Sequence, residues 1–269
     1  MARGLPTIVA VLLLAAPQPA IGRRARGEID IEAWESHISD LKQWTAREPH
    51  HANHFLRVAQ AYSVVGDTRN VVEWCRMAQE RGAHRSRAYL LMGDHYLRMH
   101  MFPKAVHSYD RALRSAQRNA QARTKLWRAV YELRRSGATA ESVDIPMLAA
   151  DLAEAGYFFP RSWQDRGPPP TEDPTRAQRL SEVGYRLLKR NDLAGAVRSF
   201  HQSLEAEPIF ADSFRGLGIA HVRQRRLEQA LGAYSMFLAL ADPDHRDISG
   251  IRKIIVDFYQ QGTGNRGGR

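Results

Sequence analysis

The densest group of reactive side chains lies between Asn191 and Pro208, in the stretch NDLAGAVRSFHQSLEAEP. One histidine with nearby carboxylates is a common set for general acid–base catalysis. Helical spacing argues against a site, because His201 follows Phe200 directly and would point away from the apolar face that Phe200 marks. Glu205 and Glu207 fall near the end of the same predicted helix. We therefore expect these groups to be solvated surface residues that do not converge.

A second candidate is the histidine cluster HHANH, which contributes His50, His51 and His54. His50 and His54 are four residues apart, a separation that puts two metal ligands on one face of a helix. Pro49 places the first two histidines in a turn, and no cysteine or carboxylate ligand stands out beside them. A polar turn is the favoured interpretation, with metal binding as the alternative, and no metal site is predicted.

No other pattern supports catalysis. Cys75 is the only cysteine, so an internal disulfide is impossible, and its setting predicts a small buried side chain. Gly216 and Gly218 lack the lysine that follows a phosphate-binding loop. The sequence contains neither a Gly-x-Ser-x-Gly elbow nor a His-Glu-x-x-His zinc motif. We predict a protein that is not an enzyme and needs no cofactor.

The same stretch acquires a different meaning when the chain is compared with itself. Residues from Leu180 onward align without a gap on residues from Phe214 onward, at an offset of 34. Small residues recur where paired helices must approach closely, at Ala59, Gly93, Gly184 and Gly218. Aromatic residues recur in the second half of the unit, at Tyr109, Phe200 and Tyr234. A period of 34 residues accommodates two helices and their turns.

At these positions the sequence resembles the tetratricopeptide repeat (TPR) family. The family pattern is Trp-x2-Leu-Gly-x2-Tyr, then Ala-x3-Phe, then Pro. The unit beginning near Ala177 meets it at Leu180, Val183, Gly184, Leu187, Ala196, Phe200 and Pro208. The resemblance implies an all-α fold, a right-handed superhelical stack of helical hairpins in two lobes with a capping helix at each end. It also implies a protein or peptide partner.

The 34-residue repeat, counted along the sequence as a fixed frame, predicts how the chain is organised. The N-terminal lobe, residues 28–156, contains a cap helix at 29–47, repeats near 52–85 and 86–119, and a divergent unit at 120–156. The C-terminal lobe, residues 176–260, contains repeats at 177–210 and 211–244 and a capping helix at 248–260. The tail, residues 261–269, is predicted to be disordered.

An insertion separates the two lobes. Ala177 lies 57 residues after Ala120 instead of 34, so 23 extra residues have entered the frame. Residues 157–175 contain five prolines and a glycine, which predict an irregular linker. Its apolar residues, Tyr157, Phe158, Phe159 and Trp163, favour packing on the divergent unit, with docking to a partner or to the protein's own groove as the alternative.

The N-terminus is typical of an export signal. Residues 5–16 are an apolar run after Arg3, and Ala20 and Gly22 fit the small residues of a cleavage site. We expect a signal peptide over residues 1–22 and an exported protein, periplasmic or extracellular and of bacterial origin. An uncleaved membrane anchor is the alternative, and it is the only membrane association expected.

The first helix of each TPR hairpin lines the concave face, which predicts the partner-binding residues. They are Leu56, Gln60, Leu90, Asp94, Leu97, Arg98, Tyr185, Lys189, Arg215, Ile219 and Arg223. This mixed apolar and basic surface suits an extended or helical peptide. Leu56, Gln60, Leu90 and Asp94 stand where some family members carry a carboxylate clamp of lysine and asparagine, so clamp-type binding is disfavoured.

Net charge is +10, and part of it is concentrated in one segment. Residues 104–135 hold nine Lys or Arg against Asp110 and Glu132, including a basic patch of Arg111, Arg114, Arg118, Arg123, Lys125 and Arg128. Such a patch favours an anionic partner. The leading hypothesis is an exported scaffold that binds a protein in cell-envelope assembly or secretion. Binding of an anionic polymer is the alternative, and no specific nucleic-acid target is expected.

Overall fold

The computed structural model of the protein describes residues 31–116, 119–137, 143–155, 157–160 and 172–264. These residues form twelve helices and no strand, so the predicted all-α class is confirmed. The expected signal segment at 1–22, most of the linker and the last five residues of the tail lie outside the described residues. Among the helices the structure describes, none is both long and apolar enough to cross a membrane.

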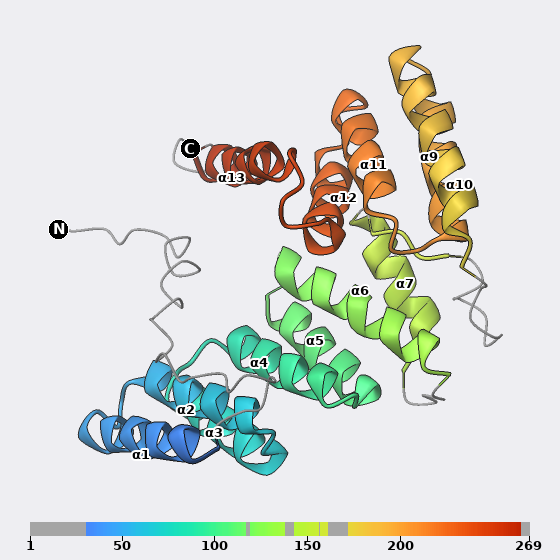
Figure 1. The fold of residues 1–269 in the computed structure, drawn as a ribbon. Coiled ribbons are helices and arrows are strands. Elements are labelled where there is room, and N and C mark those ends of the chain that lie inside the picture. The colour runs from blue at the N-terminus through green and yellow to red at the C-terminus, as the bar shows by residue number, and fades with distance from the viewer. Residues whose placement is uncertain (1–30, 117–118, 138–142, 156, 161–171, 265–269) are drawn as a thin grey trace. The chain divides into compact units, whose positions relative to one another are not determined.

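The helices follow one another as hairpins along the chain (Figure 1). In the first half they are α1 (Ile31–Arg47), α2 (Ala52–Val65), α3 (Thr68–Glu80), α4 (Arg85–Arg98), α5 (Phe102–Ser115), α6 (Ala120–Arg135) and the short α7 (Ile145–Glu154). In the second half they are α9 (Pro174–Lys189), α10 (Leu193–Ala206), α11 (Ala211–Arg223), α12 (Leu227–Leu240) and α13 (Ile248–Gly264). Each expected repeat thus holds two helices, and the last helix runs four residues beyond its expected end.

Two compact units make up the chain, one ending at His95 within α4 and one beginning at Tyr96. The sequence places the division of lobes at residues 157–175 instead. The difference has a physical cause, because α6 packs on α12 and so joins the helices on both sides of the insertion into one unit.

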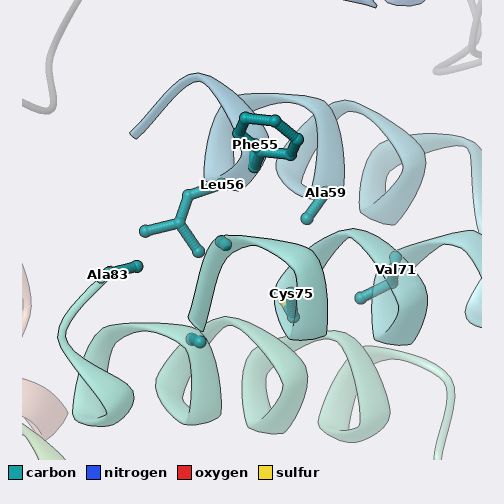
Figure 2. Packing of buried hydrophobic residues seen from close by; sticks show 8 residues of the cluster. Phe55, Leu56, Ala59, Val71, Cys75 and Ala83 are labelled. Carbon is teal, nitrogen blue, oxygen red and sulfur yellow. The ribbon is translucent and has the colours of Figure 1, made fainter. Parts of the chain in front are cut away.

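The first unit is held by small apolar clusters between successive helices. Ile38 and Leu41 of α1 pack on Val58 and Ala61 of α2, which seats the N-terminal helix as a cap. A second cluster joins α2 to α3, and Figure 2 shows Phe55 and Ala59 above Cys75. Small side chains at the crossing let the two helix backbones approach closely, as the repeat pattern predicts.

Cys75 lies inside this second cluster and is fully buried. Burial raises the pKa of the Cys75 thiol to about 12, so the reactive thiolate is scarce at neutral pH. We expect a thiol reagent at pH 8 to label the native protein at least about 100-fold more slowly than the protein in urea, because labelling requires local opening. Equal rates in both conditions would show that Cys75 is accessible, and the reaction can be followed by absorbance.

In the second unit, glycines and aromatic rings interlock as the 34-residue frame predicts. A Cβ added at Gly184 of α9 would lie 2.6 Å from the Phe200 ring of α10, and one at Gly216 of α11 would overlap the same ring. The relation recurs one repeat later, where a Cβ at Gly218 would overlap Tyr234. Phe200 is fully buried between two helices that only glycine allows so close.

The first residues of the insertion pack on the fold. Tyr157 and Phe159 are buried, and the Trp127 indole Nε1 donates a hydrogen bond to the Phe158 carbonyl at 2.6 Å. The Trp127 ring lies 5.9 Å from Phe159 and 6.1 Å from Phe214 of α11. Residues 157–160 therefore cover the divergent unit, as the favoured interpretation expects, while Trp163 lies outside the described residues.

Candidate partner-binding surface

In the first unit, the residues predicted to line the concave face fall into two groups, buried and accessible. Leu56 and Leu90 are buried, at 7% and 9% exposure, so a partner would meet their neighbours instead. Gln60 of α2 is exposed and Asp94 of α4 is half-buried. These two residues are 34 apart and belong to equivalent positions of successive first helices, so the accessible part of this face is polar.

The first helices of the two repeats lie side by side. Arg87 Nη1 of α4 donates a hydrogen bond to Asn53 Oδ1 of α2 at 3.1 Å. Deeper in the same contact, the buried His95 ring lies 3.1 Å from Ser63 Oγ and 2.8 Å from Thr68 Oγ1. His95 thus joins α4 to both helices of the preceding hairpin.

In the second unit the predicted residues lie on neighbouring first helices, α9 and α11, which contact each other. Lys189 and Arg223 are exposed, and Tyr185 and Ile219 are half-buried. Arg223 Nη1 donates a hydrogen bond to the Leu188 carbonyl at 2.8 Å, which brings the ends of α9 and α11 together. Leu97 and Arg98, at the end of α4, are half-buried and exposed.

Tyr185 and Arg215 form the most ordered part of this surface. The Arg215 guanidinium lies 5.1 Å from the centre of the Tyr185 ring, a cation–π geometry. The Tyr185 hydroxyl donates a hydrogen bond to the Asp212 carbonyl at 2.8 Å. Burial raises the pKa of Tyr185, so its hydroxyl stays protonated near neutral pH. The pair presents an aromatic face backed by a fixed cation.

Two carboxylates neutralise Arg215. Its Nη2 lies 3.1 Å from Asp212 Oδ1, and its Nη1 forms an ion pair with Asp247, just before α13. Burial opposes the charge on Arg215, but Tyr185, Asp212 and Asp247 outweigh it and raise the Arg215 pKa. With the Arg215 charge compensated, the exposed cations of this surface are those of Lys189 and Arg223.

Sequence reasoning misses both acidic partners. The spacing of Asp212 and Arg215, three residues apart on one helix, is a recognisable signal for an ion pair. Asp247 lies 32 residues from Arg215, and only the docking of α13 on α12 brings it there. The capping helix therefore shapes the surface as well as covering the end of the stack.

The stretch 191–208 is only partly the solvated surface that its spacing predicts. Asp192 caps α10, accepting a hydrogen bond from the Gly195 amide at 2.8 Å. The prediction is wrong for Glu207, which is 6% exposed, and incomplete for His201, which is half-buried and stacks on Phe158 with ring centres 4.9 Å apart. The insertion supplies the cover for His201, which helix spacing alone does not reveal. These side chains thus take part in helix capping and packing.

The basic patch lies on α5 and α6, which pack together. Arg111, Arg114 and Arg128 are exposed, whereas Arg123 and Lys125 are half-buried. Arg114 Nε donates to Asp110 Oδ2 at 2.8 Å, which offsets one of these charges. Arg118 lies outside the described residues.

Part of the second unit matches the sequence profile of a known protein family. The sequence profile of the tetratricopeptide repeat family matches residues 184–245, and no curated protein matches the chain. YrrB, a TPR protein with an unusual peptide-binding site, is 18% identical with a TM-score of 0.36, covering 79% of this chain and 97% of its own. MamA is 13% identical with a TM-score of 0.33, covering 77% and 87% respectively.

A third solved structure is the C-terminal part of a TPR repeat-containing protein from Cytophaga hutchinsonii. It is 14% identical with a TM-score of 0.34, and the match covers 77% of this chain and 74% of that one. The family profile coincides with the helices whose glycines and aromatic rings interlock at the repeat spacing. Residues 184–245 are therefore similar to the tetratricopeptide repeat family, whose profile they match.

Proposed function

We propose that this protein is a non-enzymatic scaffold that binds a peptide or protein partner through the first helices of its repeats. The observation that carries the proposal is the surface of α9 and α11, two first helices that contact each other and carry the exposed Lys189 and Arg223 with the half-buried Tyr185 and Ile219. TPR hairpins are protein-binding folds, and the family match covers this region.

The side chains of this surface favour a particular partner chemistry. An aromatic face at Tyr185 and an aliphatic side chain at Ile219 suit apolar anchors, and Lys189 and Arg223 suit nearby carboxylates. A short acidic and apolar segment, extended or helical, satisfies both requirements. Arg215 holds Tyr185 in place and does not need a partner's carboxylate, because Asp212 and Asp247 already supply two.

The place of action in this proposal is outside the cytoplasm, in cell-envelope assembly or secretion. The support is the apolar run at residues 5–16 with small residues before a cleavage position. Export is tested by sequencing the N-terminus of the mature protein from fractionated cells. A protein that begins at Arg23 in the exported fraction supports the proposal, and an intact N-terminus in the cytosol contradicts it.

Charge reversal tests the binding surface. Lys189→Glu combined with Arg223→Glu should lower recovery of specific partners at least about tenfold, because exposed interface charges contribute through complementarity. The measurement is quantitative mass spectrometry of proteins that co-purify from the native envelope. Arg198→Glu with Lys253→Glu makes the same charge change at exposed sites on α10 and α13 and should retain the partners. Equal recovery by all three proteins would exclude this surface.

A second candidate function is binding of an anionic polymer. The observation that favours it is the exposure of Arg111, Arg114 and Arg128 on two packed helices. The same charge-reversed proteins can be applied to a heparin column beside a variant in which these three arginines are glutamates. Earlier salt elution of that variant alone supports the polymer, whereas wild-type protein that passes through at low salt excludes it.

A further inference from the structure

The turn between α1 and α2 brings three potential metal ligands together. Single donor atoms of Glu48, His51 and His54 all lie within 4.8 Å of one another. The sequence pairs His50 with His54 and finds no carboxylate beside them. In the structure, His51 rather than His50 lies beside His54, and Glu48 lies beside both. The turn brings them together because it carries the end of α1 back over the start of α2.

His54 is the least exposed of the three and has an unsatisfied atom. Its Nδ1 is buried and makes no hydrogen bond within the described residues. The nearest carboxylate oxygen, Glu48 Oε2, is 3.7 Å away, which is too long for a hydrogen bond but compatible with an ion placed between the two atoms. A buried imidazole nitrogen without a partner is costly, and a bound cation would satisfy it.

His51 stands over His54 with ring centres 4.9 Å apart and planes at 15°. A tetrahedral ion with ligands at about 2.1 Å requires donor atoms roughly 3.4 Å apart. The cluster must therefore contract, and the side chains that need to move are the exposed ones of Glu48 and His51. His54 is already positioned by the Trp44 ring, 6.0 Å away on α1.

We propose that Glu48, His51 and His54 bind one divalent transition-metal ion of the zinc type. Two imidazoles and one carboxylate form a nitrogen and oxygen donor set that suits Zn²⁺, Co²⁺ and Ni²⁺, and water completes the coordination. The site joins Glu48, directly after α1, to the N-cap and first turn of α2, so its role is to fasten the N-terminal cap helix to the repeat that follows it.

The experiment uses the full chain, free of any histidine tag, titrated with Zn²⁺ in a calorimeter. We expect one equivalent to bind the wild type and the affinity to fall at least about tenfold in His51→Ala, which removes a ligand. His51 is exposed, so this variant keeps its fold even if His54→Ala does not. His50→Ala is the matched control, because it removes the adjacent exposed histidine and should bind Zn²⁺ as the wild type does.

Two further readouts report on the site itself. Ni²⁺ should quench the fluorescence of Trp44, and Glu48→Gln should weaken that quenching in parallel with zinc affinity. Absorption of bound Co²⁺ should show the bands of four-coordinate geometry, with intensity lost in His51→Ala. The proposal is overturned if no saturable one-to-one binding occurs, or if His50→Ala lowers the affinity as much as His51→Ala does.

Discussion

Replacing Phe200 with alanine is expected to lower the free energy of unfolding by about 3–5 kcal/mol, because a fully buried ring leaves a large cavity. The cavity is not easily closed. The ring lies against Gly184 of α9 and Gly216 of α11, whose backbones have no side chain to move into the space. Urea unfolding followed by helical circular dichroism measures the loss.

The contact between Gly216 and Phe200 also predicts that the effect of Gly216→Ala on stability changes sign when Phe200 is replaced by alanine. In the wild type, Gly216→Ala places a Cβ inside the Phe200 ring and should destabilise the protein by about 1–3 kcal/mol. In the Phe200→Ala background the overlap is gone, and alanine should stabilise α11 by up to about 1 kcal/mol through its better helix propensity. If Gly216→Ala lowers the free energy of unfolding equally in both backgrounds, the Phe200 ring is not the reason that position 216 requires glycine.

Acid is expected to weaken the second unit through His201. Burial, with a smaller effect of nearby His221, lowers the pKa of His201 from 6.5 to about 4. As the pH falls below 6.5 the unfolded chain gains a proton that the folded protein does not accept, so stability falls until about pH 4. At pH 4.5 this loss is about 2–3 kcal/mol relative to pH 8.

His201→Phe separates this effect from the titration of carboxylates. Phenylalanine retains an aromatic ring against Phe158 but cannot bind a proton. The variant should therefore lose about 2–3 kcal/mol less stability than the wild type between pH 8 and pH 4.5. The comparison at pH 8 is the internal control, since His201 is neutral there in both states. Parallel stability curves for the two proteins would contradict a lowered pKa of His201 in the folded protein.

The repeat period predicts those parts of the fold that depend on contacts between equivalent positions. Gly184 with Phe200 and Gly218 with Tyr234 are pairs 16 residues apart in two successive units, and the structure places each glycine under its ring. Periodicity succeeds here because a small residue and a large one must alternate wherever two helices cross. The exposed Lys189 and Arg223 follow from the same frame.

The remaining features depend on contacts that occur once. Leu56 and Leu90 point toward the concave face by spacing, yet the neighbouring packing buries them. His201 is half-buried because Phe158 stacks on it, and Asp247 reaches Arg215 only because α13 docks on α12. The positions of Glu48 and His51 depend on the path of a turn. None of these contacts repeats along the chain, so no period in the sequence can report them.

Arrays of identical repeats lengthen and shorten by duplication or loss of whole units, because every unit presents the same face to the next. The contact around Trp127 removes that interchangeability. Trp127 meets Tyr131, Phe159 and Phe214 rather than the small residues of a regular neighbour, and Phe158 accepts the hydrogen bond of its indole. A copied hairpin inserted here would find no matching face. A duplicated hairpin at this junction would have to reproduce the contacts of Trp127, whereas the regular repeats on either side carry the repeating glycine and aromatic pairs.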